Sequence, residues 1–387
     1  MKPRDFNYHF KLTLPTLAVL LVAAVQHERL GKLEPDGKLE LALNVMGRTG
    51  LSARDEGEMT AGYYEGLLDG AQNTASKSRG LLANLSALKQ APPDWKDFAQ
   101  TTAAMHVGGY IQYEIAPNDR IEHAGVLFVS NQWGQRDKDY TKARPAGVRR
   151  LALVGSSIGV GSGVLMEKTY EALLEDQLNS APVCAGAPPI EIINFSVPGY
   201  QITQLLDVAV DKAPSFEPNV VLLEINVLIA FPNWANHIAA LVQKGEDLKY
   251  DFLKRFAEEA NLSATDSTSR ISTKLAMHRI AITEACVSEA QRRLKEKGIE
   301  LVLLAIPFTA TREELHPMIY EILDRVKPLG LPVISSVDAY GTLGLEELRI
   351  RDYDNHPNEL GHRLMFEAMD KGIREDPRLR RIVAGCE

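Results

Sequence analysis

The sequence predicts an α/β fold with a five-stranded, mostly parallel sheet that helices cover on both faces. Two observations lead to this prediction. Short apolar runs alternate with segments of helical periodicity from residue 149 onward, and these runs are nearly continuous in Val, Leu and Ile. Such runs are typical of parallel strands buried on both faces. The expected strands span residues 151–154, 190–195, 220–225, 299–306 and 331–335.

Helices are expected between and after these strands. They span residues 169–178, 201–212, 271–297, 312–326 and 359–370. The stretch 230–270 is longer than a plain connection and rich in charge, so we expect it to be helical and to form a lid or a partner surface. In sheets of this kind, functional sites gather at the carboxyl ends of the strands.

The N-terminus resembles a secretory signal or a short membrane anchor. Basic residues at Lys2, Arg4 and Lys11 precede residues 12–25, which carry no charge. The sequence therefore predicts an exported protein, on the periplasmic or extracellular side, with membrane association through residues 12–25. If this segment is instead part of the fold, the protein is cytoplasmic.

Three regions follow from these patterns. Residues 1–28 form the signal or anchor. Residues 29–145 form an N-terminal extension that is largely helical over 33–88 and has short strands and turns over 100–148. Residues 146–387 form the catalytic domain.

The amino-acid composition limits the classes of binding partner that we expect. Of the 387 residues, 45% are hydrophobic and 24% are charged, an ordinary balance for a globular protein. The net charge is -8 and no extended basic stripe is present, so a nucleic-acid partner is not expected. Cys184, Cys286 and Cys386 lie far apart without metal-ligand spacing, so they allow one disulfide and indicate no metal site.

A serine follows the first expected strand. Residues 151–163 read LALVGSSIGVGSG, which is a strand followed by a Gly/Ser loop. Ser157 can be a nucleophile there, because a tight turn exposes the hydroxyl and brings backbone N–H groups close to it. Gly155-x-Ser157-x-Gly159 also fits the nucleophile-elbow pattern. A turn without chemistry is the plain alternative.

The same loop allows a dinucleotide interpretation. Gly155, Gly159 and Gly161 have the spacing found in short-chain dehydrogenases, and Tyr250 and Lys254 offer a Y-x-x-x-K pair. An NAD(P) cofactor would follow from this alternative. It is the weaker one, because the loop begins far from the start of the chain and the Tyr250–Lys254 pair lies in a highly charged stretch.

A histidine with acidic neighbours follows the last expected strand. In residues 351–362, RDYDNHPNELGH, His356 is expected in a loop just before a helix. Asp352 and Asp354 are both close enough in sequence to orient it, as a serine hydrolase requires. His362 is expected on the face of the helix.

Two further candidates follow the second and third strands. Gly199 lies in the turn of NFSVPGY, where a glycine lets the backbone approach a ligand closely. Asn226 ends VLLEIN, where its side chain can donate to a developing oxyanion.

The order Ser157, Gly199, Asn226, His356 resembles the four blocks of the SGNH (GDSL-like) hydrolases. The segments INFSVPG (193–199) and HPNELGH (356–362) are similar to the second and fourth blocks, and NQWGQR (131–136) resembles the N-x-x-G-x-R lead-in of exported members. The sequence departs from the family at Ser156, where Asp is usual, and at Glu224 and Val227, where Gly and Asp are usual.

The resemblance implies a three-layer α/β/α sandwich, SGNH or flavodoxin-like, that acts as a serine esterase or O-acyltransferase. The implied catalytic residues are Ser157, Asp354 and His356, with Asp352 as the alternative acid. Ser157, Gly199 and Asn226 would form the oxyanion hole, and no metal or organic cofactor is implied. The expected substrate is an acylated small molecule or polysaccharide, with O-acetyl groups of a carbohydrate first. The departures leave a second alternative, a degenerate site that only binds a glycan or a partner protein.

Overall fold

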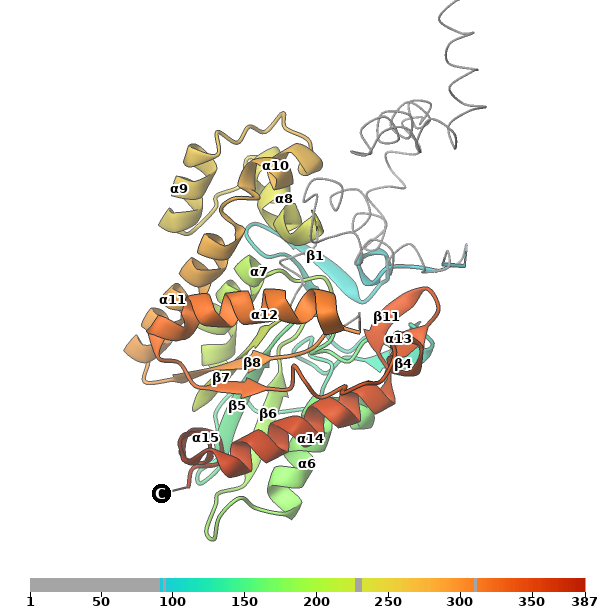
Figure 1. The fold of residues 1–387 in the computed structure, drawn as a ribbon, viewed down its shortest axis with the longest axis vertical. Helices are drawn as coiled ribbons and strands as arrows, with labels where there is room; N and C mark the ends of the chain where they lie inside the picture. Colours follow the sequence, from blue (N-terminus) through green and yellow to red (C-terminus); the bar gives the residue numbers. More distant parts are fainter. Residues whose placement is uncertain (1–90, 93–94, 227–231, 310–311, 387) are drawn as a thin grey trace, which may run out of the picture. The chain divides into compact units, whose positions relative to one another are not determined.

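The computed structural model describes residues 91–92, 95–226, 232–309 and 312–386 (Figure 1). All of them belong to one compact unit of the chain, Gly62–Glu387. The apolar segment 12–25 and the expected helical extension over 33–88 lie outside the described residues. Among the helices that are described, none has both the length and the apolar character needed to cross a membrane.

A five-stranded sheet forms the centre of the described unit. Its strands are β5 (Arg149–Val154), β6 (Ile190–Asn194), β7 (Val220–Ile225), β8 (Glu300–Ala305) and β9 (Val333–Ser335). Their order is β6-β5-β7-β8-β9 and every pairing is parallel, so the predicted sheet is confirmed. The chain leaves β5 toward β6 on one side and returns to β7 on the other. This reversal makes the carboxyl ends of β5 and β7 neighbours, which is where such sheets place their sites.

Helices cover both faces of this sheet. On one face α6 (Tyr170–Ser180), α14 (Glu359–Glu375) and α15 (Pro377–Ala384) pack against Leu151 and Leu153. On the other face α7 (Ile202–Asp207) and α11 (Arg279–Glu296) pack against Ala152 and Val154. Successive residues of β5 alternate between the two cores because side chains alternate across a strand. The predicted three-layer arrangement is therefore present (Figure 1).

Two predicted helices differ from the observed ones. The single helix expected over 271–297 is wrong, because the chain forms α10 (Thr268–Leu275), turns, and begins again at α11. Met277 in the turn is 93% exposed, whereas Leu275 and Ile282 on either side are buried. Their apolar spacing continues across the turn, so periodicity does not reveal the break. Over 201–212, where a single helix is expected, the chain forms α7 followed by a short π-helix, Val208–Lys212.

From Pro232 on, the stretch 230–270 is largely helical, as predicted. It contains the short helix Pro232–Ala235, α8 (Asn236–Lys244) and α9 (Asp251–Glu259). His237 ties α8 to the body of the unit: its Nδ1 lies 2.7 Å from Thr203 Oγ1 and its Nε2 contacts the carbonyl of Tyr110. Burial lowers the pKa of His237 to about 4, so this histidine is neutral at pH 7. Whether the stretch acts as a lid stays a prediction.

Two hairpins precede the sheet in the chain. The first pairs β1 (Ala104–Gly108) with β2 (Gln112–Ile115), and the second pairs β3 (Arg120–His123) with β4 (Val126–Val129). The strands and turns expected over 100–148 are thus confirmed. Ile115 and Phe128 lie in the same apolar core as Val154, so these hairpins pack against the sheet domain.

Cys184 and Cys386 form a disulfide that joins the loop after α6 to the segment after α15. This is the one bridge that three cysteines allow. The remaining thiol, Cys286, is buried in α11.

Candidate active site

Ser157 lies in a tight loop after β5, which we call the serine loop (residues 155–164). The loop closes on itself, since Val160 N donates to Ser156 O at 3.0 Å and Ser162 N donates to Ser157 O at 3.0 Å. Ser157 is only 4% exposed, and its Oγ has no hydrogen-bond partner among the described residues. Leaving a buried hydroxyl unpaired costs about 1–3 kcal/mol, so each such group calls for an explanation, and a catalytic role is one of the explanations.

Arg136 binds the backbone of the serine loop. Its guanidinium donates to the carbonyls of Val160 (2.9 Å), Gly161 (2.5 Å) and Val164 (2.6 Å). The side chain is 2% exposed and lies 5.1 Å over the ring of Phe128. Burial lowers the pKa of Arg136 to about 10, which still leaves it charged at pH 7.

The N-x-x-G-x-R segment places that arginine. Asn131 Oδ1 accepts the N–H groups of Trp133 (2.9 Å) and Gln135 (3.0 Å), which fixes a turn. Gly134 adopts φ +70, and a Cβ there would lie 2.2 Å from the carbonyl oxygen of Ile115. The asparagine and the glycine therefore shape the turn, and Arg136 emerges from it toward the serine loop.

Asn194 ties the same loop to the end of β6. Its Nδ2 donates to Gly159 O at 2.9 Å, and its Oδ1 accepts the N–H of Ser196 at 3.0 Å. Its own N–H donates to Asp137 Oδ2 at 2.8 Å. The first asparagine of the NFSVPG block is thus a structural link rather than a reacting group.

Glu224, at the end of β7, is the third side chain that binds the serine loop. The side chain is buried, and its Oε1 accepts the hydroxyl of Ser156 at 2.9 Å, while its Oε2 accepts the Ser156 N–H at 3.3 Å. The amide nitrogen of Asn226 also donates to Oε1. Burial raises the pKa of Glu224, and these hydrogen bonds oppose that rise.

His356 lies in a short strand, not in the loop that the sequence predicts. Strand β11 (Asp354–Pro357) pairs with β10 (Arg349–Arg351), and the hairpin leads directly into α14. His356 Nδ1 is 2.6 Å from Asp354 Oδ1, and the same oxygen accepts the His356 backbone N–H at 3.1 Å. Because a carboxylate only accepts, the ring contact places the imidazole proton on Nδ1, and the backbone hydrogen bond holds the carboxylate beside the ring.

Asp352, the alternative acid, faces another partner. Its Oδ1 accepts a hydrogen bond from Arg349 at 3.1 Å, and its side chain is 48% exposed. Asp354 is 1% exposed. Of the two aspartates, Asp354 is the one in contact with the His356 ring.

The serine loop and the β10–β11 hairpin lie against each other. A Cβ at Gly163 would be 2.2 Å from the Ile350 side chain, which places the end of the loop on β10. His123, at the end of β3 in the other hairpin, is electrostatically coupled to His356, and burial together with this coupling lowers the pKa of His123 to about 4. No sequence pattern indicates His123, because it lies outside the four blocks.

His362 lies in α14, as predicted, and on the buried face of that helix. Its Nδ1 accepts the N–H of Tyr170 at 3.1 Å, and its ring stacks on that of Tyr170 at 5.6 Å. Burial lowers the pKa of His362 to about 3, so it is neutral. The second histidine of HPNELGH therefore caps the start of α6.

Gly199 and Asn226 complete the set of predicted site residues. Gly199 has φ +83 in the turn after β6, and a Cβ there would lie 2.7 Å from Tyr113 Oη. Asn226 Nδ2 donates to Ser156 Oγ at 3.3 Å, and Ser156 directly precedes Ser157 in the chain. Both are therefore at the carboxyl edge of the sheet, with the serine loop.

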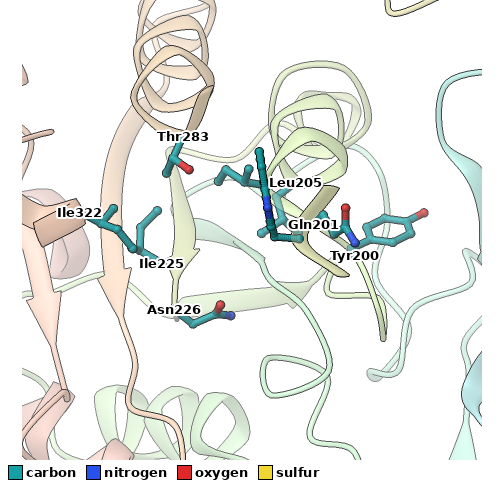
Figure 2. A pocket seen from close by; sticks show the side chains of 9 residues that line it. Tyr200, Gln201, Leu205, Ile225, Asn226, Thr283 and Ile322 are labelled. Atoms are coloured by element: carbon teal, nitrogen blue, oxygen red, sulfur yellow. The ribbon is translucent and has the colours of Figure 1, made fainter. Parts of the chain in front are cut away.

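A hollow opens beside Asn226. Figure 2 shows Asn226 at one end of it, with Ile225 and Ile322 on one side and Leu205 on the other. The remaining lining residues are Tyr200, Gln201, Ile202, Trp234 and Thr283. The hollow is mainly apolar, and of its lining residues Asn226 also contacts the serine loop, at Ser156.

The Tyr250 and Lys254 side chains have other partners than the glycine loop. Tyr250 is buried and donates to Asp207 at 2.9 Å, and Lys254 pairs with Asp247 at 3.0 Å. Within the described residues, no cluster of three or more His, Cys, Asp or Glu side chains is arranged to hold a metal ion.

Neither a family model nor a curated protein matches the chain. Solved structures do. An acetylxylan esterase from Geobacillus stearothermophilus is similar at 15% identity and a TM-score of 0.39, over 58% of this chain and 94% of that one. A putative lipolytic protein of the G-D-S-L family from Desulfitobacterium hafniense is similar at 13% identity and a TM-score of 0.35, over 58% and 98%. A two-domain esterase active on acetylated mannans is similar at 16% identity and a TM-score of 0.37, over 59% and 50%.

The strand order places the first three blocks together. Ser157, Gly199 and Asn226 follow β5, β6 and β7, which are adjacent in the sheet. The fourth block supplies His356 from the hairpin beside the serine loop. With its parallel sheet and the flanking helices, the described part of the chain has a three-layer α/β/α fold, and the ordered blocks that resemble those of the SGNH hydrolases lie at the carboxyl edge of its sheet and on the hairpin beside it.

Proposed function

We propose that this protein is a serine esterase or O-acyltransferase, with Ser157 as nucleophile, His356 as base and Asp354 as the acid that orients the base. The observation that carries the proposal is the 2.6 Å contact between His356 Nδ1 and Asp354 Oδ1. It leaves Nε2 as the basic nitrogen, on a hairpin that packs against the serine loop. A buried serine hydroxyl without a hydrogen-bond partner among the described residues supports the same assignment.

The proposed reaction has two halves. In the first, His356 Nε2 takes the proton of Ser157, whose Oγ attacks the ester carbonyl carbon. The backbone N–H groups of Ser157 and Gly199 and the amide of Asn226 receive the oxyanion. The imidazolium then gives its proton to the leaving alcohol, and the acyl group stays on Ser157. In the second half, water or a sugar hydroxyl attacks the acyl-enzyme and releases an acid or a new ester.

The surroundings of the site support separate positions for the acyl group and for the sugar of the substrate. The acyl group would enter the apolar hollow that begins at Asn226. Tyr353, between β10 and β11, and Trp95 are partly exposed, with ring centroids 5.2 Å apart, and the ring of Trp95 lies 6.1 Å from that of His123. Aromatic faces next to the base suit the ring of a sugar. An O-acetylated carbohydrate is therefore the substrate class that we propose first.

Export to the periplasmic or extracellular side is proposed with the activity. The Cys184–Cys386 disulfide is of a kind that persists in oxidising compartments and is rare in the cytosol. This fits the basic and apolar pattern of residues 1–25. Deleting residues 1–28 should abolish any membrane association, and an unchanged distribution of the full-length protein in the cytosol would contradict the proposal.

Covalent labelling tests the activity directly. A fluorophosphonate should label the wild-type protein, and p-nitrophenyl acetate should be hydrolysed. Ser157→Ala should lose both reactions while Ser162→Ala, in the same loop, retains them. Folded wild-type protein that neither reacts nor hydrolyses would favour the glycan- or partner-binding alternative.

A further inference from the structure

The sequence departs from the SGNH pattern at two positions that touch each other in the structure. Ser156 stands where the family carries Asp, and Glu224 stands where it carries Gly. Ser156 donates to the Glu224 carboxylate through both its hydroxyl (2.9 Å) and its backbone N–H (3.3 Å). Two departures in separate blocks thus form a single contact.

We propose that the two departures are one exchange: the carboxylate beside the nucleophile has moved from the serine loop to the end of β7, and Glu224 positions the oxyanion hole. The inference rests on the proposed esterase or acyltransferase function. Glu224 is a positioning residue here, because it acts on the serine loop and on Asn226 rather than on substrate.

The geometry of the sheet allows this exchange. Strands β5 and β7 are parallel neighbours, and Val154 pairs with Leu223. The next residues along the two chains, 155 and 224, therefore lie beside each other. Position 156 is one residue further on. The longer side chain of a glutamate can reach from the strand to the place that the shorter aspartate occupies from the loop.

The hydrogen bonds of Glu224 determine how Asn226 is oriented. The carboxylate accepts from the Ser156 hydroxyl and N–H, from the Asn226 amide and from the backbone N–H of Gly159. An ionised carboxylate only accepts, and it has about four lone-pair sites. The end of the Asn226 side chain that faces Glu224 must therefore be its NH₂ group. One hydrogen of this group is held by Glu224, and the other faces Ser156 Oγ at 3.3 Å, so this second hydrogen is the one proposed to turn to the oxyanion.

The glycines of the serine loop fit the same interpretation. A Cβ at Gly155 would lie 2.2 Å from Glu224 Oε2, and a Cβ at Gly159 would lie 2.7 Å from it. The loop is thus wrapped around an internal carboxylate. This explains the G-x-x-x-G spacing without a dinucleotide, because the Glu224 carboxylate takes the N–H groups that a phosphate would need.

A double-mutant cycle tests the exchange. Glu224→Gly removes the carboxylate, and Ser156→Asp alone brings a second one against Glu224. Each should lower the thermal midpoint by on the order of 10 °C, because a buried group loses its partner or gains a like charge. Ser156→Asp with Glu224→Gly restores the family pair and should return the midpoint to within a few degrees of wild type. Losses that simply add in the double variant would overturn the exchange.

Glu224→Gln tests positioning at nearly constant shape. Its NH₂ group would face N–H donors, so we expect kcat for p-nitrophenyl acetate to fall about 100-fold with KM nearly unchanged. Glu300→Gln, at the exposed start of β8, is the matched control and should keep wild-type kcat. A wild-type kcat in Glu224→Gln would refute the positioning role.

The two readouts separate this inference from the proposed function. If wild-type protein neither hydrolyses esters nor reacts with a fluorophosphonate, the proposed function fails. The thermal cycle still decides whether Ser156 and Glu224 form one exchanged unit. If wild-type protein is active but the double variant does not recover, the function stands and the exchange is wrong.

Discussion

Asp354 contacts the ring of His356 at 2.6 Å from two residues away along the same short strand. Strand β11 presents the carboxylate and the imidazole together, because residues i and i+2 project to the same side of a strand. The hairpin with β10 holds this pair against the serine loop. An acid and a base that share one rigid strand need little reorganisation before they act.

Asp354→Asn should abolish most of the activity. The amide cannot stabilise an imidazolium and favours the wrong tautomer, so kcat should fall by about 10³-fold or more, with the fold retained. Asp352→Asn is the control and should stay within a few-fold of wild type, since Asp352 pairs with Arg349. Hydrolysis of p-nitrophenyl acetate checks both variants. The opposite ranking would make Asp352 the acid.

Arg136→Lys should loosen the serine loop. A lysine keeps the charge, but it lacks the planar guanidinium that donates to three carbonyls at once. We therefore expect kcat to fall about 10- to 100-fold. Arg144→Lys is a matched control. Arg144 also donates to backbone carbonyls, those of Glu217 and Val148, but not in the serine loop. Equal losses in the two variants would show a general effect on stability and no specific role for the loop.

Asp137 should make stability depend on pH. Burial, together with the nearby Glu175, raises the pKa of Asp137 to about 7, above its ordinary value. The folded state then binds more protons than the unfolded state between about pH 4 and 7, so stability falls as pH rises through this window. Relative to Asp137→Asn, wild type should lose ~2 kcal/mol of unfolding free energy between pH 5 and pH 8.

Urea unfolding at the two pH values measures this difference. Asp139→Asn, at an exposed neighbouring position, serves as the control and should change little with pH. A constant difference between wild type and Asp137→Asn would show that Asp137 is ionised throughout the range.

Ile322→Ala should widen the hollow beside Asn226. The added space should raise kcat/KM for p-nitrophenyl butyrate relative to the acetate by about 10-fold, since each methylene in an apolar pocket is worth ~1–3 kcal/mol. Ile319→Ala is the control, because Ile319 is buried on the same helix, α12 (Arg312–Val326), but in the opposite core. An unchanged preference in Ile322→Ala would place the acyl group elsewhere.

The sequence by itself determined the sheet and predicted which residues are candidates for the site. The apolar runs predicted all five strands, because a strand buried on both faces has no polar alternation to obscure it. Block order indicated Ser157, Gly199, Asn226 and His356, and strand order then brought the first three to one edge. What local pattern could not show was the break before α11, where apolar spacing runs on through a turn.

Only the tertiary structure decided how the blocks support one another. Asp352 and Asp354 are equivalent by sequence distance, and only the register of β10 with β11 turns one of them toward His356. Ser156 and Glu224 look like independent losses until the parallel pairing of β5 with β7 brings them together. Contacts between residues far apart in the chain depend on which strands become neighbours, and periodicity along the chain does not contain that information.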